Sequence, residues 1–401
     1  MESKKKIPEV KLVSKTPEVK LVSKTPEVKP SSKTPEVKPS SKTPEVKPSS
    51  KAPEVKPSSK APEVKPSSSK TPEVKPSSKI LEEKGANWSE ETKQVLREQI
   101  FKATDTSKIA VAQTQEERTA RNLLEMKQPI IGYQILNKLD KGGMGTVFRA
   151  LQMATGKEIA LKLLSPDLCE NPIVLKQFVK EGTMMLQLDH ENIIKGLDFG
   201  CSNGLYFLAM EIVIGESLYS FLRSGFTFKP IQALQLVLQC ANALAHLEEK
   251  DIIHRDIKPA NILLTSDFQV KLCDLAFAVK RSELARGSEG DMTCGTVEYI
   301  SPEQARAQRD IDIRSDIYSL GVTLYHMLTG QLPFRSSNPN EVMRMHCYEP
   351  INQELLRAKV SKGMAMLITK MMEKEPDKRF QPKQLSNTVK MMLEKLSQSA
   401  S

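Results

Sequence analysis

A nine-residue unit close to Lys-Thr-Pro-Glu-Val-Lys-Pro-Ser-Ser recurs through residues 1–79 of this 401-residue chain. The triplet Pro-Glu-Val begins at eight positions, which are residues 8, 17, 26, 35, 44, 53, 62 and 72. Prolines remove backbone donors, and a typical unit offers a hydrophobic core only one valine. Because so little apolar surface cannot offset the entropy lost on ordering, we expect residues 1–79 to form a disordered, extended tail rich in proline and lysine. Any folded domain must come from the rest of the chain.

The basic charge of the chain lies in this tail. Residues 1–79 hold 19 Lys and 9 acidic residues, a net charge of +10 that equals the net charge of the whole chain. Such a tail can attract an anionic partner, or it can act as a solvated spacer. Its lysines alternate with glutamates and have no aromatic neighbours that could stack on bases, so we expect no specific binding to nucleic acid.

Residues 80–128 are interpreted as a linker with one short amphipathic helix between Trp88 and Phe101. A serine followed by two glutamates is typical of a helix start, and apolar residues follow at helical spacing: Val95, Leu96, Ile100 and Phe101. Packing on the following domain and pairing of two chains both remain open for this helix.

The six cysteines, residues 169, 201, 240, 273, 294 and 347, include no Cys-x-x-Cys pair. Their spacing indicates neither a disulfide framework nor a zinc site, and it suits a reducing compartment. No signal peptide opens the sequence, and no uninterrupted apolar run approaches about 18 residues. We therefore expect a cytoplasmic protein without a transmembrane anchor.

The chemistry is indicated by the string His-Arg-Asp-Ile-Lys-Pro-Ala-Asn at residues 254–261. Asp256 can accept the proton of a substrate hydroxyl, Lys258 can neutralise charge on a moving phosphate, and Asn261 offers an oxygen ligand that suits Mg²⁺. These spacings favour a transferase that uses ATP. The string resembles the catalytic loop of the protein kinases, and the lysine two residues after the aspartate is similar to the serine/threonine branch.

Other parts of that family's pattern follow the same order. Residues 139–147 are interpreted as a strand, a glycine-rich turn and a second strand whose N–H groups could cover phosphates. A glycine cluster alone favours a plain hairpin, but this one precedes Lys162, and its Gly-Gly-Met-Gly core resembles bacterial members. The resemblance assigns ATP contacts here to Leu139, Lys141, Gly142, Gly143, Met144, Gly145 and Val147.

Three charged residues complete the resemblance. Lys162 lies in Ile-Ala-Leu-Lys-Leu-Leu, which alternates like a half-buried strand and resembles the family's Val-Ala-Ile-Lys, whose lysine contacts phosphates. Glu181 lies on a helical pattern and would orient Lys162. Asp274 follows a short apolar run and would bind metal together with Asn261. The implied cofactors are ATP and Mg²⁺, with Mn²⁺ as the alternative metal.

The adenine would bind where a strand runs into a connector at residues 207–213. Residues of these apolar types are core material by default, and only the flanking motifs indicate a binding slot. The resemblance assigns the slot and the hinge to Leu139, Val147, Ala160, Met210, Glu211, Val213 and Leu263.

Two departures from the family pattern affect the expected activity. Asp140 replaces the first glycine of the phosphate loop, where its charge would repel phosphates unless the side chain points to water. The usual Asp-Phe-Gly is Asp-Leu-Ala here, and Ala276 would cost about 1 kcal/mol if its backbone needed a positive φ. Leu275 can fill the same pocket as phenylalanine. A pseudokinase that binds without turnover, and an interaction protein acting through its tail, remain alternatives to the enzyme.

Residues 293–303 are similar to the end of an activation segment, with Ser-Pro-Glu in place of Ala-Pro-Glu. Thr296 would contact Asp256 and Lys258. Thr293 and Ser288 are candidate phosphorylation sites, because a phosphate there could engage the donors of Arg255. The resemblance also predicts that Glu303 and Arg379 form a buried ion pair, and that Asp316 ties its helix to the catalytic loop.

The resemblance implies a two-lobed α+β protein kinase fold over residues 129–398. The smaller lobe would be mostly antiparallel sheet plus the Glu181 helix, and the larger lobe mostly helical, with helices indicated at residues 231–247 and 362–372. The implied function is a serine/threonine protein kinase that phosphorylates protein hydroxyls and its own activation segment. Its partners would be ATP, a protein substrate and an anionic partner of the tail. The Thr-Pro and Ser-Ser steps of the tail are further candidate autophosphorylation sites.

Overall fold

The structure is a computed structural model that describes residues 129–285 and 295–398. The predicted tail at residues 1–79, the predicted linker helix within residues 80–128, and the candidate phosphorylation sites Ser288 and Thr293 lie outside the described residues.

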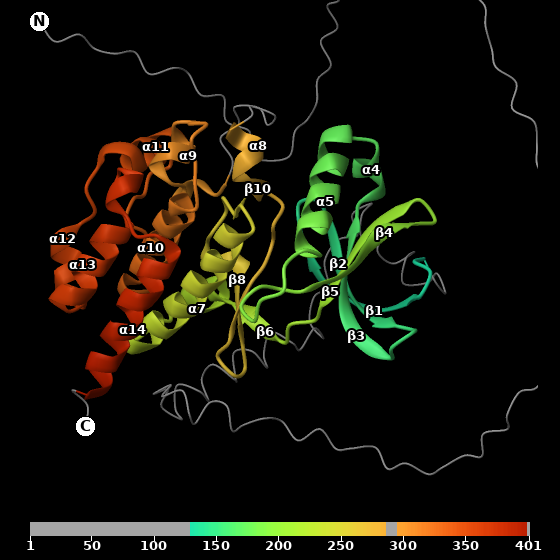
Figure 1. The fold of residues 1–401 in the computed structure, drawn as a ribbon, viewed down its shortest axis with the longest axis horizontal. Coiled ribbons are helices and arrows are strands. Elements are labelled where there is room, and N and C mark those ends of the chain that lie inside the picture. The colour runs from blue at the N-terminus through green and yellow to red at the C-terminus, as the bar shows by residue number, and fades with distance from the viewer. Residues whose placement is uncertain (1–128, 286–294, 399–401) are drawn as a thin grey trace, which may run out of the picture. The chain divides into compact units, whose positions relative to one another are not determined.

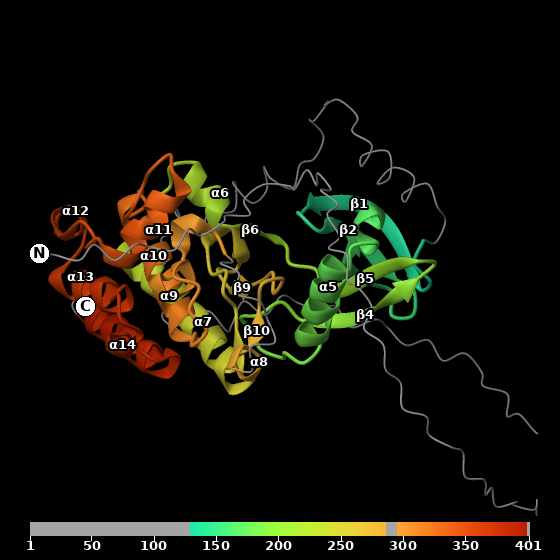
Figure 2. The ribbon, with the colours of Figure 1, turned by 90° about the horizontal axis from the view of Figure 1, so that it is seen from above.

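The first part of the described chain is an antiparallel five-stranded sheet in the order β1-β2-β3-β5-β4. Helix α5 lies against this sheet (Figures 1 and 2). Gly182 of the helix allows the ring of Phe199 in β4 to approach closely. The elements are β1 Tyr133–Lys141, β2 Gly145–Gln152, β3 Lys157–Leu164, α4 Pro166–Cys169, α5 Pro172–Met185, β4 Gly196–Ser202 and β5 Leu205–Glu211.

The side chains of β3 alternate between two hydrophobic clusters, one on each face of the sheet. Ile159, Leu161 and Leu163 join a small buried cluster on one face of the sheet. Ala160 and Leu164 belong to the large cluster that includes α5 residues. Since successive side chains of a strand point to opposite faces, Lys162 lies on the face of α5. The sequence pattern of β3 thus directs Lys162 toward the helix that carries Glu181.

The second part of the described chain is mostly helical (Figure 1). Its helices are α6 Leu218–Arg223, α7 Pro230–Glu249, α8 Arg281–Ala285, α9 Pro302–Ala305, α10 Arg314–Thr329, α11 Pro339–Tyr348, α12 Gln353–Lys359, α13 Lys362–Met371 and α14 Pro382–Gln398. Short 3₁₀ turns are η1 Pro259–Asn261, η2 Val297–Tyr299 and η3 Pro376–Lys378. The expected helices at residues 231–247 and 362–372 are confirmed as α7 and α13, and the expected two-lobed α+β fold is confirmed.

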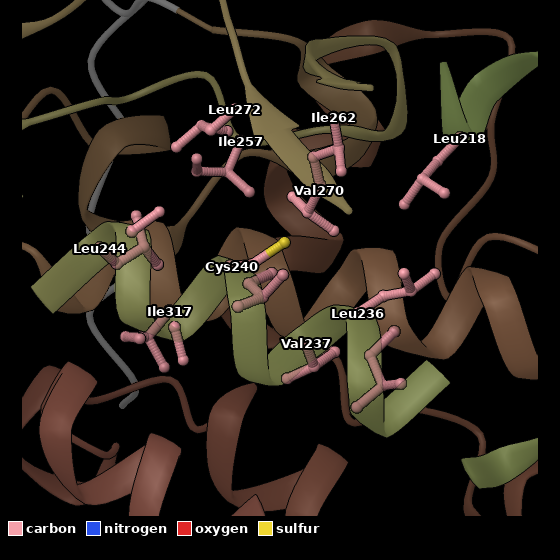
Figure 3. Packing of buried hydrophobic residues seen from close by; sticks show 14 of the residues in the cluster. Leu218, Leu236, Val237, Cys240, Leu244, Ile257, Ile262, Val270, Leu272 and Ile317 are labelled. Carbon is pink, nitrogen blue, oxygen red and sulfur yellow. The ribbon is translucent and has the colours of Figure 1, made fainter. Parts of the chain in front are cut away.

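Helix α7 is central to the packing of this part. It starts with proline at its first turn and carries apolar residues at helical spacing. Figure 3 shows Leu236, Val237, Cys240 and Leu244 of α7 directed at buried residues of the neighbouring strands and of α10. Helix α14 runs beside α7 (Figure 2).

Two small sheets carry the loops of the candidate site. One contains β6 Gly215–Ser217, β8 Ile262–Thr265 and β9 Val270–Leu272, and the other pairs β7 Ile252–Ile253 with β10 Val279–Lys280. The backbone of Leu272 donates to Asn192 O at 2.8 Å and accepts from Ile194 N at 2.9 Å. These bonds join β9 to the segment that leads into β4. None of the helices in residues 129–285 and 295–398 has the length and apolarity needed to cross a membrane.

Candidate active site

The loop after β7 is held by the first turn of α10. Asp316 is completely buried there, and its two carboxylate oxygens accept the backbone N–H groups of His254 and Arg255, each at 2.8 Å. Burial raises the pKa of Asp316 to about 6, although the two N–H groups act in the opposite direction. Arg255 has a φ of 65°, so the chain turns sharply before Asp256. The predicted tie between this helix and the loop is confirmed.

Three of the sequence-predicted residues meet around the carboxylate of Asp256. Lys258 Nζ lies 2.7 Å from Asp256 Oδ2, and Asn261 Nδ2 donates to the same oxygen at 2.9 Å. Thr296 donates to Asp256 Oδ1 through its backbone N–H and its hydroxyl, both at 3.0 Å, while Lys258 donates to Thr296 Oγ1 at 2.7 Å. The predicted contacts of Thr296 with Asp256 and Lys258 are confirmed. The 3₁₀ turn η1 explains how Lys258 and Asn261 both face Asp256.

A second charged pair joins the sheet to α5. Lys162 Nζ lies 2.7 and 2.8 Å from the two carboxylate oxygens of Glu181, and both side chains are largely buried. Burial alone would lower the pKa of Lys162, but the carboxylates of Glu181 and Asp274 raise it above its usual value. Lys162 is therefore a cation at neutral pH, and Asp274 lies within its electrostatic reach.

Asp274 follows β9 in a left-handed conformation, with a φ of 65°. Leu275 is 2% exposed and packs in the large core, as the prediction of an apolar plug requires. Ala276 has no positive φ, so the condition for its expected penalty is not met in this structure. The backbone oxygen of Ala276 accepts a bond of 2.7 Å from Gln177 Nε2 of α5. Sequence reasoning missed Gln177, since a lone glutamine on a helix carries no chemical signal.

The glycine-rich turn closes a hairpin between β1 and β2, in which Gly142 N donates to Gly145 O at 2.9 Å. Gly145 has a packing requirement, because a Cβ there would lie 1.9 Å from Leu163 O of β3. Space around Gly143 is open. Asp140 is exposed, and its carboxylate accepts the backbone N–H of Lys141 at 2.7 Å. Its side chain thus lies in solvent, the condition under which the expected repulsion of phosphates is relieved.

The predicted adenine slot lies on the same face of the sheet as Lys162. Val147 is paired with Lys162, and Ala160 is paired with Met210, so their side chains share one face. Strand β5 ends at Glu211. The carboxylate of Glu211 accepts from Lys195 N at 3.0 Å and from Lys271 Nζ at 2.7 Å.

The connector after β5 leaves backbone groups available at the slot. Within the part of the chain that the structure describes, neither the N–H nor the carbonyl of Val213 forms a hydrogen bond. Leu139, at the opposite edge, is 44% exposed, and Leu263 is half-buried on β8. This combination of open backbone groups and apolar side chains suits a flat heterocycle.

Asn261 and Asp274 are the residues that could hold a metal ion. Asn261 Nδ2 donates to both Asp256 O and Asp256 Oδ2 at 2.9 Å, so the amide oxygen of Asn261 is turned away from Asp256. An amide oxygen and a carboxylate are hard donors that fit Mg²⁺, which keeps several of its water ligands. In the described ranges, no group of three or more His, Cys, Asp and Glu residues is placed to hold a metal ion.

Two residues missed by the sequence reasoning position the loops. Gly295 has a φ of 112°, and a Cβ there would lie 2.9 Å from Arg255 O. Gln304 donates to the same oxygen at 2.7 Å. Gln304 also completes a capping box with Ser301 at the start of α9, which is the signal that could have identified it.

Two cations of the described residues, Arg255 and Lys180, already have partners. Arg255 Nε donates to Phe277 O at 2.7 Å, so this guanidinium is already used in part. Lys180 of α5 pairs with Glu283 of α8 at 3.4 Å.

The predicted pair of Glu303 and Arg379 is confirmed, with two hydrogen bonds of 2.6 and 2.8 Å and almost complete burial of both side chains.

Comparison with known proteins agrees with this geometry. A family model described as the protein kinase domain matches residues 133–389. The chain is 35% identical over 257 residues to the serine/threonine-protein kinase pkn2 of Myxococcus xanthus, covering 62% of this chain and 31% of that protein. It is 32% identical over 250 residues to the serine/threonine-protein kinase PrkC of Bacillus subtilis, covering 62% and 38% of the two chains. It is 32% identical over 257 residues to the serine/threonine-protein kinase PknB of Mycobacterium tuberculosis, covering 62% and 41%. The chain therefore spans less than half the length of each of these curated relatives.

Proposed function

Because this chain belongs to the protein kinase family, we propose that it transfers the γ-phosphate of ATP to serine and threonine hydroxyls of proteins. The observation that carries the proposal is the cluster around Asp256, in which Lys258, Asn261 and Thr296 all lie within hydrogen-bonding distance of one carboxylate. These are the groups that phosphoryl transfer to a hydroxyl requires.

In the proposed reaction, Asp256 orients the acceptor hydroxyl and takes its proton as the hydroxyl oxygen bonds to the γ-phosphorus. The bond from that phosphorus to the oxygen of the ADP leaving group breaks in the same displacement. Lys258 balances the negative charge that develops on the transferred group. Thr296 holds Asp256 and Lys258 in position through its hydrogen bonds with both.

Lys162, Asp274 and Asn261 would position the nucleotide. Glu181 directs the ammonium of Lys162 toward phosphate oxygens, and Gln177 ties α5 to the segment after Asp274. Asn261 and Asp274 would hold a divalent ion, with Mg²⁺ expected and Mn²⁺ as the alternative. When bound, that ion neutralises charge on the phosphates.

The remaining assignments of the nucleotide site complete this proposal. The backbone of Glu211 and Val213 would bind the adenine edge, between apolar residues at Leu139, Val147, Ala160, Met210 and Leu263. The turn from Lys141 to Gly145, including Gly142, Gly143 and Met144, would cover the phosphates. Phosphorylation of Thr293 or Ser288, an anionic partner of the tail and a cytoplasmic location stay predictions.

The test is transfer of labelled γ-phosphate from Mg-ATP to a generic basic protein and to the chain itself. Wild-type protein should label serine and threonine, and Asp256→Asn should lower the rate by about 10²-fold or more without lowering the melting temperature. The side chain of asparagine keeps the shape of aspartate, so a folded variant isolates the chemical role. Folded wild-type protein that transfers no label would contradict the proposal. Label on tyrosine alone would contradict the assignment of serine and threonine hydroxyls as the acceptors.

A further inference from the structure

A groove of about 1400 Å³ lies among α12, α13 and α14, in the helical part of the chain. Its lining mixes apolar and basic residues, among them Arg357, Lys362, Met366, Lys370, Phe380 and Met392, with Glu373 as its acidic member. None of the residues proposed for catalysis or for nucleotide binding lines this groove. An occupant would therefore leave the candidate active site open.

One face of α13 forms a wall of the groove. Lys362, Met366 and Lys370 are spaced by four residues, which places them along one stripe of the helix. Met366 is 62% exposed between the two lysines. Phe380 contributes its ring at the end of this stripe, where Lys370 Nζ lies 4.3 Å from the ring centroid. The stripe thus presents an apolar contact flanked by two positive charges.

The charges of the groove are not balanced within the described residues. Glu373 lies near Lys378, which also forms a 2.9 Å pair with Glu375. In residues 129–285 and 295–398, no acidic side chain forms an ion pair with Arg357, Lys362 or Lys370. These three cations border an apolar floor and offer charge complementarity to carboxylates.

We propose that this groove, the α12–α14 groove, binds a segment of a partner protein in which carboxylates flank large apolar side chains. Apolar side chains of the segment would contact Met366, Met392 and the edge of Phe380, and its carboxylates would pair with Arg357, Lys362 and Lys370. Such a segment matches both the apolar floor and the uncompensated charge, whereas a purely apolar or a basic segment matches only one of them or neither.

Phe380, which lines the groove, is next in sequence to a residue of the active-site scaffold. Phe380 directly follows Arg379, whose guanidinium is paired with Glu303 of α9. Docking is nevertheless independent of phosphoryl transfer, because its contacts lie outside the candidate active site. Binding can therefore be measured without any kinase activity.

The experiment uses the full chain and a fluorescein-labelled peptide in which pairs of glutamates alternate with Leu-Phe pairs. Fluorescence anisotropy should show saturable binding that weakens with added salt. Peptides with lysine in place of glutamate, or with serine in place of leucine and phenylalanine, should bind at least about tenfold more weakly. Asp256→Asn should bind the acidic peptide as wild type does, which separates this proposal from the proposed function.

The decisive variants reverse two of the positive charges that line the groove. Arg357→Glu combined with Lys370→Glu should weaken peptide binding by about tenfold or more. The matched control, Lys359→Glu combined with Lys390→Glu, makes the same charge change at exposed residues outside the groove, on α12 and α14. Met366→Ser should weaken binding while leaving the net charge unchanged.

Four results would overturn the proposal. Equal losses of peptide binding in Arg357→Glu/Lys370→Glu and in the control double variant would show that only the net charge of the chain matters. Absence of saturable binding to folded wild-type protein would exclude this partner chemistry. An unlabelled peptide of residues 80–101 would assign the groove to the chain's own linker if it bound more tightly than the acidic probe and lost this binding in Arg357→Glu/Lys370→Glu. Concentration-dependent dimerisation that is lost in the same double variant would assign the groove to a second copy of the chain.

Discussion

At the scale of single residues, Gly145 and Gly143 differ in why they are glycines. Both belong to the turn that the sequence associates with phosphate binding. In the structure, Gly145 is required by its approach to β3, since a Cβ would lie 1.9 Å from the backbone oxygen of Leu163. Gly143 faces open space. A motif glycine can therefore be needed for packing as well as for its ligand.

Gly145→Ala should lower the free energy of unfolding by about 1–3 kcal/mol, because the added methyl group forces the hairpin and β3 apart. Gly143→Ala is the matched control, and it should change stability little. Urea unfolding of both variants measures the difference. Equal stabilities would contradict the packing role of Gly145.

Asp140 is the residue whose charge raised the question of weak nucleotide binding. Its carboxylate is exposed and bonded to the N–H of Lys141. Exposed charge is screened by water and salt, so Asp140→Gly should change the KM for ATP by less than about threefold. Initial rates at several ATP concentrations measure this effect. A fall in KM of tenfold or more would show that the carboxylate repels the phosphates directly.

At the scale of elements, the pair of Glu303 and Arg379 joins α9 to the turn before α14. Burial alone would raise the pKa of Glu303, but hydrogen bonds and charge from Arg379 hold it below its usual value. A depressed folded-state pKa contributes stability above the unfolded pKa near 4.5, and this contribution is lost as the pH falls through the folded pKa.

Glu303→Gln should lower the free energy of unfolding at pH 7 by about 3 kcal/mol, because it leaves a buried guanidinium without its carboxylate. The variant should also lose stability less steeply than wild type as the pH falls below about 4.5. Urea unfolding across that range measures both effects. Glu375→Gln, which changes an exposed pair with Lys378, is the control and should leave stability nearly unchanged. Parallel pH profiles of wild type and Glu303→Gln would contradict the linkage.

At the scale of the whole molecule, the candidate site draws on separate elements. Lys162 comes from β3, Glu181 from α5, and Asn261 and Asp274 from the two ends of the β8–β9 hairpin. A nucleotide that contacts all of them binds only the folded chain. Binding should therefore stabilise the molecule as a unit.

Mg-ATP at about 100 times its Kd should stabilise the fold by about 2.7 kcal/mol, seen as a rise in the melting temperature. Chelation of the metal with EDTA should abolish most of this rise, and so should Asp274→Asn. Asp267→Asn makes the same substitution at an exposed position in the turn of that hairpin, and it should keep the full rise. An unchanged rise in Asp274→Asn would remove this residue from the metal site.

Much of this architecture was predictable from the sequence because it is written in local patterns. The alternation of β3 and the apolar spacing of α7 and α13 depend on the periods of strands and helices. The fold class followed from the order of motifs. The expected penalty at Ala276 did not apply, since only the folded backbone reveals that the positive φ belongs to Asp274.

The sequence by itself determined which chemical groups are present and their order, from Lys162 to Asp256, Lys258 and Asn261. It also determined that the tail has too few apolar residues for a core. The tertiary structure decided what those groups touch. Arg255 and Asp316 are 61 positions apart, and Glu303 and Arg379 are 76 apart, yet both pairs form direct hydrogen bonds. The α12–α14 groove also exists only through packing. Local periodicity encodes which face a side chain takes, whereas contacts between distant segments depend on how all the faces pack together.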